Sequence, residues 1–466
     1  MKKYLSILLA LLLMFGLLSA CGKTEQPPAT DPPAKTDPPK ETEKDDGDLS
    51  AEITIWSMPL TSGVDYDEIL KNDLIAPFNK TYPNVKVEVD MMTWEGGPER
   101  LTIALGTGAT PDIYLDGTAR TAALPTKAKL VDMTDVLDKH RDKILPSLLT
   151  IGLVDGKNYL VPNSAMTSST FTLNLTLAKK LGVDNLIPED RNKWSRDDMY
   201  ELLKAAAEAG KNEGIYGVAL YAGSATEDIR YYSLMLSNGG KIVSDDKKTC
   251  LANSPECVEV ITFLKKLVDD GLAAPGAATI KSEDVATLFY NSKALMMLAG
   301  GPGSTYTLLK RMKEEKSIDE VPELISVGIP TKDGKSPYVS ASWGANMFAT
   351  FENKNDADKI AAAKALLDFY WNAPDAHKNI ALNSSYVPAM QGMQVDYPDP
   401  VLKGLIEEAN YCLKEFGDSS FGILEPFWVE LRSVFYPELQ AVFSNTKTPQ
   451  EAMDTFKTKV DEILNK

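Results

Sequence analysis

Three side chains near the ends of predicted strands could bind a ring-shaped polar solute. Trp56 ends the alternating stretch 53–56, Asp116 follows the apolar stretch 112–115, and Arg120 comes four residues later. An aromatic face packs against the apolar C–H faces of a sugar ring, while carboxylate and guanidinium groups bond its hydroxyl rim. Each also has a structural explanation: Trp56 can fill a core, and Asp116 with Arg120 can form a surface ion pair.

Motifs for bond-breaking chemistry are missing. The sequence contains neither GxSxG nor HExxH, no GxxxxGK[ST] stretch for nucleotide phosphates, and only the histidines His140 and His377. Carboxylates that could pair as in a glycosidase are so numerous that they indicate little. We therefore expect a binding protein, not an enzyme. A lipid-anchored enzyme acting on polysaccharide is the alternative, and turnover of oligosaccharides would reveal it.

The N-terminus has the order of an export signal. Lys2 and Lys3 precede an apolar run over 7–18, which is too short to span a bilayer comfortably. The run stops at Leu18-Ser19-Ala20-Cys21, which resembles a bacterial lipobox. The resemblance implies that 1–20 is a lipoprotein signal peptide and that Cys21 carries lipid such as palmitate, at the extracytoplasmic face of the cell membrane. An ordinary secreted protein or an uncleaved anchor is the alternative.

Three further cysteines remain. Cys250 and Cys257 lie seven positions apart and could close a small disulfide loop outside the cell, whereas Cys412 is expected to be a buried free thiol. No CxxC pair or cysteine–histidine cluster is present, so we expect no metal and no cofactor.

Length, charge and composition define the organisation. A chain of 466 residues is longer than one ordinary core needs, so two lobes are expected. The net charge of −17 without a basic block disfavours nucleic acid as a partner. Residues 21–50, rich in Pro, Thr, Lys and acidic residues, should form an extended flexible tether.

Strand-like and helix-like stretches alternate along the folded part. This order predicts an α/β fold with parallel strand pairing, in which ligands bind beyond the carboxyl ends of strands. The capping residues Ser195 and Asp198 predict the start of a helix. The predicted strands are 53–56, 85–89, 112–115, 171–174, 214–220, 294–298 and 343–349, and the predicted helices are 67–82, 99–105, 195 onward, 256–269, 357–371 and the tail 426–462.

Three blocks of sequence carry a family resemblance. LGTGATPDIY (105–114), LVDMT (130–134) and DGKNYLVP (155–162) together resemble the family 1 extracellular solute-binding proteins of carbohydrate ABC importers, to which maltose-binding protein belongs. The resemblance implies a two-lobed, type II periplasmic-binding-protein-like fold with the ligand in the cleft between the lobes. Lobe 1 would comprise 51–163 with 330–388, and lobe 2 would comprise 164–329 with 389–466.

The resemblance also adds site residues. Tyr231 and Trp428 match stacking positions, while Asp116 replaces an aromatic residue of the family. The other implied contacts are Asn163 and Tyr386 at the hinge crossings, Gly301 in a glycine loop and Trp343, which can equally be core. The glycine loop is open to two explanations, an anion-binding nest or close approach of the lobes.

The implied function is capture of a polar solute, a mono- or oligosaccharide, by lobe closure. Its partners would be the membrane subunits of an importer, which recognise the closed, monomeric protein. A sensory receptor on the same fold is a further alternative.

Overall fold

The computed structural model describes residues 49–165, 170–226, 228–341, 344–384, 386–418 and 421–466. The predicted signal peptide, Cys21 and nearly all of the predicted tether lie outside the described residues, as does Trp343. Among the described helices, none is long and apolar enough to cross a membrane.

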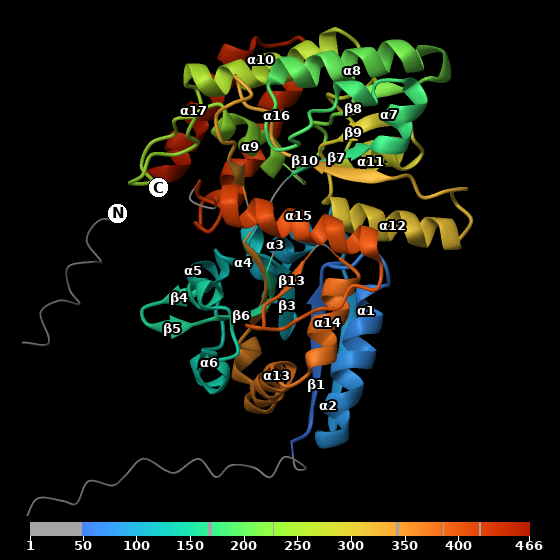
Figure 1. The fold of residues 1–466 in the computed structure, drawn as a ribbon. Helices are drawn as coiled ribbons and strands as arrows, with labels where there is room; N and C mark the ends of the chain where they lie inside the picture. Colours follow the sequence, from blue (N-terminus) through green and yellow to red (C-terminus); the bar gives the residue numbers. More distant parts are fainter. Residues whose placement is uncertain (1–48, 166–169, 227, 342–343, 385, 419–420) are drawn as a thin grey trace, which may run out of the picture. The chain divides into compact units, whose positions relative to one another are not determined.

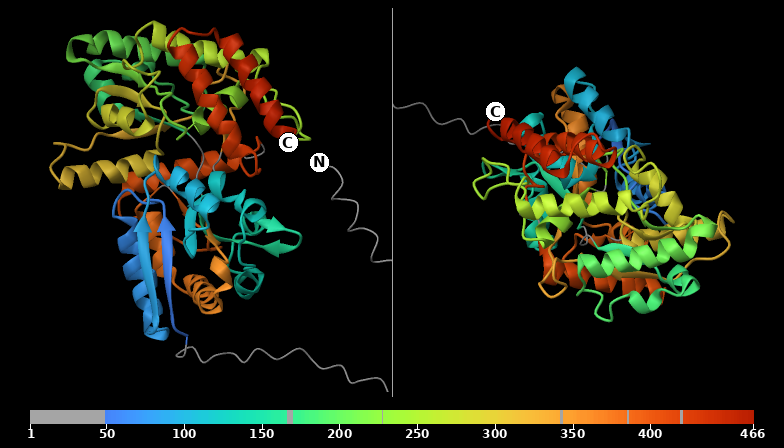
Figure 2. Two further views of the ribbon diagram at one scale, coloured as in Figure 1. Left: turned by 180° about the vertical axis from the view of Figure 1, so that it is seen from behind. Right: turned by 90° about the horizontal axis from the view of Figure 1, so that it is seen from above.

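The first sheet has six described strands in the order β13-β6-β12-β3-β1-β2. Strand β1 pairs in parallel with β2 and β3, as the alternating sequence predicts, while β12 runs antiparallel to β3 and β6. Figure 2 shows β1 and β2 side by side. The strands are β1 (Ala51–Ser57), β2 (Val85–Met91), β3 (Ile113–Gly117), β6 (Leu160–Ala165), β12 (Ala345–Thr350) and β13 (Val387–Pro388).

Helices pack on this sheet, and α13 lies against β1 (Figure 1). The helix predicted over 67–82 is confirmed as a continuous helical stretch with a π-helical middle, η2. The helical elements are α1 (Tyr66–Ile69), η2 (Leu70–Ile75), α2 (Ala76–Thr81), α3 (Gly97–Thr107), α4 (Thr118–Thr121), α5 (Leu124–Lys127), α6 (Thr134–His140), η3 (Pro146–Thr150), η6 (Asn353–Asn355), α13 (Ala357–Tyr370) and α14 (Pro374–Leu382), with the hairpin β4 (Leu153–Val154) and β5 (Lys157–Asn158).

The second sheet has four described strands in the order β10-β7-β9-β8. Helices α8 and α11 pack on its strands, and α8 begins at the predicted capping box, with Ser195 and Asp198 bonding each other's backbone. The strands are β7 (Phe171–Asn174), β8 (Tyr216–Ala219), β9 (Ala294–Met297) and β10 (Leu324–Val327); a small pair is formed by β11 (Ser340–Ala341) and β14 (Gly417–Asp418).

The helical tail predicted over 426–462 is confirmed as two helices, α16 and α17. Helices α9, α11, α12, α14 and α15 were not predicted from the sequence. The remaining helical elements are α7 (Leu175–Leu181), η4 (Asp184–Leu186), α8 (Arg196–Gly210), η5 (Lys211–Glu213), α9 (Ile229–Ser237), α10 (Pro255–Asp269), α11 (Ser282–Tyr290), α12 (Pro302–Glu314), α15 (Pro400–Phe416), α16 (Trp428–Phe443) and α17 (Pro449–Leu464).

Two separate hydrophobic cores go with the two sheets. One is built from buried residues within 49–165 and 345–389, and we call this part lobe 1. The other is built from residues within 171–341 and 412–460, and we call this part lobe 2. Ala119 of α4 is the exception, because it packs into the lobe 2 core although α4 directly follows strand β3 of lobe 1. The expected two-lobed α/β architecture is therefore present.

The cysteines of lobe 2 are buried thiols. All three are free thiols, Cys250, Cys257 and Cys412. The structure therefore has no disulfide bond between Cys250 and Cys257. Burial raises the pKa of the Cys250 thiol to about 12 and that of Cys257 to about 11, so neither is a reactive thiolate at neutral pH. The expectation of a buried thiol at Cys412 is confirmed.

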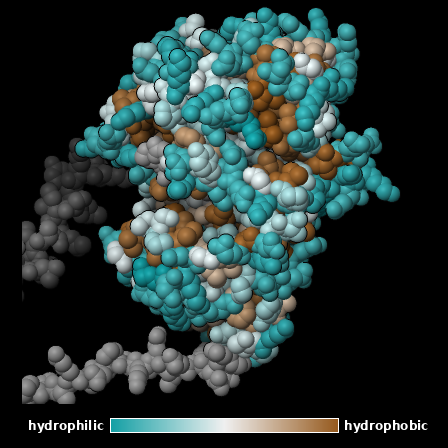
Figure 3. Space-filling view, viewed as in Figure 1, coloured by the Kyte–Doolittle hydropathy of each residue, from teal (hydrophilic) through white to brown (hydrophobic). Residues whose placement is uncertain are grey.

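The face of the molecule drawn in Figure 3 is mainly polar. Most of the face in Figure 3 is hydrophilic, with separate hydrophobic areas between the polar side chains. This pattern fits the net charge of −17, which favours solubility.

Candidate functional site

The first edge of the candidate site is formed by strand ends of lobe 1. Because β1, β2, β3 and β6 run in the same direction, their carboxyl ends meet at one edge, together with the start of the antiparallel β12. Asp116 and Gly117 end β3, and Asn346 lies beside Gly117 at the start of β12. Trp94 and Glu95 follow β2. Polar groups from distant parts of the sequence therefore meet at this edge.

Asp116 and Arg120 form a buried ion pair at this edge. Asp116 is fully buried, and its Oδ1 accepts from Arg120 Nη2 at 2.6 Å, while its Oδ2 accepts from Arg120 Nε and from the Tyr114 hydroxyl. Burial alone would lower the pKa of Arg120, but Asp116 raises it above its ordinary value. The guanidinium also lies 5.5 Å from the centre of the Trp94 ring. The pair is thus buried, in contrast to the surface ion pair that was the alternative.

Lobe 2 carries a second pair of the same kind. Arg432 of α16 donates from Nε and Nη2 to the two carboxylate oxygens of Asp228, at 2.8 and 2.7 Å, and also to the Ala225 carbonyl. Asp228 is fully buried and Arg432 is nearly so. Burial would lower the pKa of Arg432, but Asp228 raises it. The partners lie 204 positions apart, so no local sequence signal connects them.

The two arginines lie close enough to influence each other. The charge on Arg120 acts against the protonated form of Arg432, and α4, which carries Arg120, packs against α16. Ala119 enters the lobe 2 core at this contact. The two ion pairs therefore approach each other across the boundary between the lobes.

Polar contacts cross this boundary elsewhere. Glu95 lies 3.4 Å from the Thr226 hydroxyl and 3.7 Å from Lys281 Nζ of lobe 2. Two exposed ion pairs join the lobes at other places, Asp65–Arg311 at 2.7 Å and Lys127–Glu430 at 3.1 Å. Glu95 thus contacts lobe 2, although neither it nor Trp94 is among the site residues predicted from the sequence.

Trp56 lies in a different place from the ion pairs. Its ring is covered by the Arg100 guanidinium, 3.7 Å from the ring centre. It lines a groove of about 420 Å³ along α3, and no other predicted site residue lines it among the described residues. The other lining residues are Gly96, Glu99, Arg100, Ile103, Ala104, Thr107 and Ala109.

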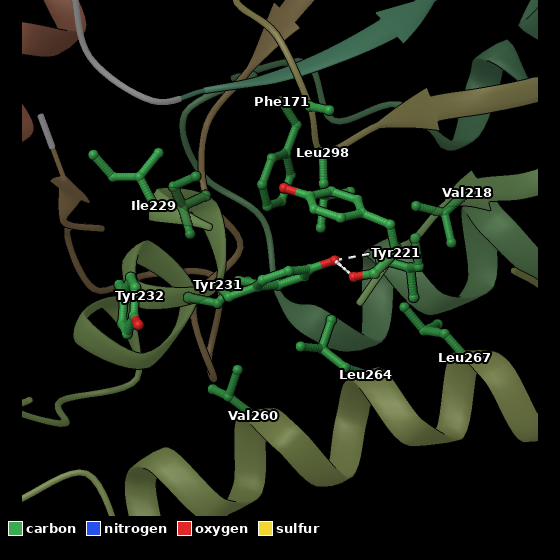
Figure 4. Close-up of a cluster of buried hydrophobic side chains, with 14 of the residues drawn as sticks. Phe171, Val218, Tyr221, Ile229, Tyr231, Tyr232, Val260, Leu264, Leu267 and Leu298 are labelled. Carbon is green, nitrogen blue, oxygen red and sulfur yellow. Dashed lines mark hydrogen bonds between the residues drawn. The ribbon is translucent and has the colours of Figure 1, made fainter. Parts of the chain in front are cut away.

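Tyr231 lies inside the lobe 2 core (Figure 4). It is fully buried, and its hydroxyl donates to the Tyr221 carbonyl at 2.6 Å. The rings of Tyr221 and Phe435 lie 5.6 and 6.5 Å from it. In Figure 4 the side chains of α10 lie below its ring. These contacts explain its position by packing, and its contact with a solute stays a prediction.

Trp428 is also fully buried, at the start of α16 and one turn before Arg432. Its ring packs 5.1 Å from Tyr232 and 5.0 Å from Phe421. Its indole N–H and the Tyr232 hydroxyl have no hydrogen-bond partner among the described residues. These contacts place Trp428 in the lobe 2 core, and its contact with a solute stays a prediction.

The hinge residues have separate environments. The Asn163 amide donates to the Tyr66 and Tyr370 hydroxyls at 3.0 and 3.2 Å, so its bonds stay within lobe 1. Tyr386 is half-buried beside β13 and packs on the lobe 1 core. Gly301 is the N-cap residue of α12 in lobe 2. The hydrogen bonds of Asn163 and the ring contact of Trp56 thus lie away from the ion pairs, whereas the backbone N–H of Tyr231 bonds the Asp228 carbonyl at 2.9 Å.

The described residues contain no group of three His, Cys, Asp or Glu side chains arranged to hold a metal ion.

Comparison with known proteins identifies the family. Residues 60–375 match the family model described as bacterial extracellular solute-binding protein. The chain belongs to this family. A binding protein of Brucella abortus is 23% identical over 422 residues, covering 89% of this chain and 93% of that protein. The diacetylchitobiose binding protein of Streptomyces coelicolor is 28% identical over 212 residues, 45% of each chain.

Solved structures show the same fold. A solute-binding protein of Thermotoga lettingae bound with α-D-tagatose matches with a TM-score of 0.72 at 18% identity, covering 89% of this chain and 100% of that one. The expected two-lobed, type II periplasmic-binding-protein fold is therefore confirmed. The family model describes extracellular proteins that bind solutes.

Proposed function

We propose that this chain is the lipid-anchored, extracytoplasmic solute-capturing subunit of an ABC importer, and that its solute is a mono- or oligosaccharide. The observation that carries the proposal is the approach of two buried Arg–Asp pairs, Asp116–Arg120 and Asp228–Arg432, from opposite lobes. Each lobe thereby contributes a rigid polar group to the same boundary.

These pairs suit sugar hydroxyl groups. The Asp116 carboxylate holds the Arg120 guanidinium in one plane, so an N–H group of Arg120 that does not bond Asp116 is a donor at a defined angle. Trp94, beside Arg120, adds an aromatic face for the C–H side of a ring. Relatives named for diacetylchitobiose and bound with tagatose support a saccharide as the solute.

Contacts from both lobes would make the closed form more stable when the solute is bound. A ligand shifts such an equilibrium only through its higher affinity for the closed state. Importer membrane subunits would then recognise the closed protein and receive the solute. Hydrolysis of a nucleotide would take place in a separate subunit, and this chain would act without catalysis.

The saccharide can be found by a thermal-shift screen of the full-length chain with sugars and polyols, because binding to the native state raises the melting temperature. For the best hit, we expect Arg120→Lys to weaken affinity roughly tenfold, since lysine keeps the charge beside Asp116 but loses the planar fork. Calorimetric titration measures this change.

Arg100→Lys is the matched control, because Arg100 covers Trp56 in the separate groove. Unchanged affinity in Arg100→Lys supports the boundary between the lobes as the site. If Arg100→Lys weakened binding and Arg120→Lys did not, the solute would bind in the Trp56 groove and the proposed site would be wrong.

The lipid anchor is a separate part of the proposal and rests on the lipobox resemblance at Cys21. We expect wild-type protein in the membrane fraction of expressing cells and Cys21→Ala protein, intact and able to bind the same sugar, in the medium. Immunoblotting of both fractions measures this. Cys412→Ala should stay with the membrane, and membrane retention of Cys21→Ala would contradict lipid anchoring.

A further inference from the structure

Arg311 of lobe 2 is shared between a partner in lobe 1 and a partner in its own helix. Its Nη1 donates to Asp65 Oδ1 at 2.7 Å across the boundary between the lobes, and its Nε donates to Glu315 Oε1 at 2.9 Å, one turn further along α12. Both carboxylates raise the pKa of Arg311, and Asp65 does so more than Glu315. All three side chains are partly exposed, so this cluster lies at the surface and outside the two cores.

Glu430 of lobe 2 is shared in the same way, with the charges reversed. Its Oε1 accepts from Lys127 Nζ of lobe 1 at 3.1 Å, and its Oε2 accepts from Lys466 Nζ, which follows α17 of lobe 2, at 3.2 Å. The two lysines lower the pKa of Glu430, and Lys127 does so more than Lys466. The partner in the other lobe is again the one with the larger effect.

Lys281 of lobe 2 is the third shared charge. Its Nζ lies 3.7 Å from Glu95 Oε2 of lobe 1, and it also attracts the carboxylate of Glu283, two positions further along the chain in α11. Burial and then the charge of Glu95 raise the pKa of Glu283, while Lys281 opposes this effect. The carboxylate of lobe 1 thus repels the carboxylate of lobe 2 that shares the same lysine.

The three places have one arrangement in common. Each shared charge of lobe 2 has one partner in lobe 1 and another in lobe 2, and we call the form with the lobe 1 contacts made the closed form. The two partners carry the same sign, so each weakens the attraction of the other for the shared charge. Separation of the lobes breaks only the contact with lobe 1. The shared charge then keeps its partner in lobe 2, which lowers the cost of opening.

We propose that Arg311, Glu430 and Lys281 are switching charges, which hold the lobes closed weakly without solute and keep only their lobe 2 partners when the lobes open. The proposal goes beyond solute capture and rests on the proposed function only in requiring that the lobes move. Exposed ion pairs each contribute little, so the open and closed forms differ little in free energy. A solute then shifts the population with a modest preference for the closed form.

The test measures the distance between spin labels on the two lobes by pulsed electron paramagnetic resonance, without solute. The labels are attached at Lys80→Cys in α2 and Glu208→Cys in α8, both exposed positions, in the full chain carrying Cys21→Ala. The three other cysteines are buried and their thiol pKa values are raised, so they do not react with the label. The label distance in the structure described above is the closed reference.

Removal of the two partners of one switching charge should have opposite effects. Asp65→Asn removes the lobe 1 partner, and we expect the ratio of closed to open protein to fall roughly two- to fivefold, as for an exposed ion pair. Glu315→Gln should raise this ratio, because the Arg311 guanidinium then bonds Asp65 without competition from Glu315. Lys127→Met and Lys466→Met form a second set, with a fall and a rise expected in the same order.

Lys86→Met is the matched control, because it breaks an exposed ion pair with Glu52 inside lobe 1 and should leave the label distances unchanged. Salt at about 1 M screens exposed charges and should shift the wild type toward the open form. If Asp65→Asn and Glu315→Gln shifted the distances in the same direction, or not at all, the switching charges would be wrong.

The same labels separate this proposal from the proposed function when the sugars of the thermal-shift screen are added, glucose, galactose, N-acetylglucosamine and maltose among them. A sugar that closes the lobes while the variants have no effect would leave the proposed function standing and overturn the switching charges. Opposite shifts in the variants while no sugar changes the distances would support the switching charges and count against the proposed function.

Discussion

Replacing Arg432 with methionine should lower the free energy of unfolding by about 3–5 kcal/mol, as expected when one partner of a buried ion pair is removed. The change takes away the guanidinium that shares two hydrogen bonds with the fully buried Asp228 and a third with the Ala225 carbonyl. Methionine keeps most of the side-chain volume, so the loss reports the pair and not a cavity. Urea unfolding at pH 7 measures it.

Two further variants show whether burial is the cause. Lys86→Met breaks the ion pair between Lys86 and Glu52. The side chains of both residues are largely exposed, so the free energy of unfolding should stay unchanged. Arg432→Met combined with Asp228→Asn removes both charges and should recover part of the loss, because no uncompensated carboxylate stays buried. Equal effects of Arg432→Met and Lys86→Met would contradict the buried pair.

The protein should lose up to about 3 kcal/mol of stability between pH 6.5 and pH 4 through His377 alone, since each pKa unit corresponds to about 1.4 kcal/mol. Burial lowers the pKa of His377 to about 4 from its ordinary value of 6.5. The folded protein therefore resists protonation that the unfolded chain accepts. Stability falls as pH drops through this window, and is unaffected by His377 above it.

Urea unfolding at pH 7, 5.5 and 4 measures this effect. His377→Gln removes the titrating group, so its stability should fall less than that of the wild type between pH 7 and pH 4. The comparison is needed because carboxylates titrate in the same experiment. Parallel pH profiles of the two proteins would show that His377 accepts a proton as easily in the folded state as in the unfolded chain.

Elements that depend on neighbours in sequence were predicted well. The alternation at 53–56 became β1, with Ile53 and Ile55 buried, and Ser195 with Asp198 capped α8. Asp116 and Arg120 were brought together because they stand four positions apart, on β3 and the turn of helix that follows it. The bonds of the capping box and of the Asp116–Arg120 pair join residues close in sequence, whereas β1 was predicted from its alternating pattern and pairs with the more distant β2 and β3.

Several helices were missed, among them the buried α9 and the amphipathic α15. Helix α9 buries nearly all of its residues, so its sequence lacks the polar face that marks a surface helix. Helix α12 begins in a glycine-rich stretch that was interpreted as a loop alone. The family model and the matching solved structures support the two-lobed fold more directly than these elements do.

For the candidate site, too, some features follow from local sequence and others only from the tertiary structure. Local patterning predicted that strands end in polar residues, and the spacing of Asp116 and Arg120 offered an ion pair as the alternative to solute contacts, because backbone bonding and side-chain spacing act over a few residues. Only the tertiary structure decided that Asp228 meets Arg432 over 204 positions, that Trp56 turns to a separate groove and that Tyr231 is enclosed. Burial is a property of the packed chain, since each side chain is covered by residues that the local sequence does not contain.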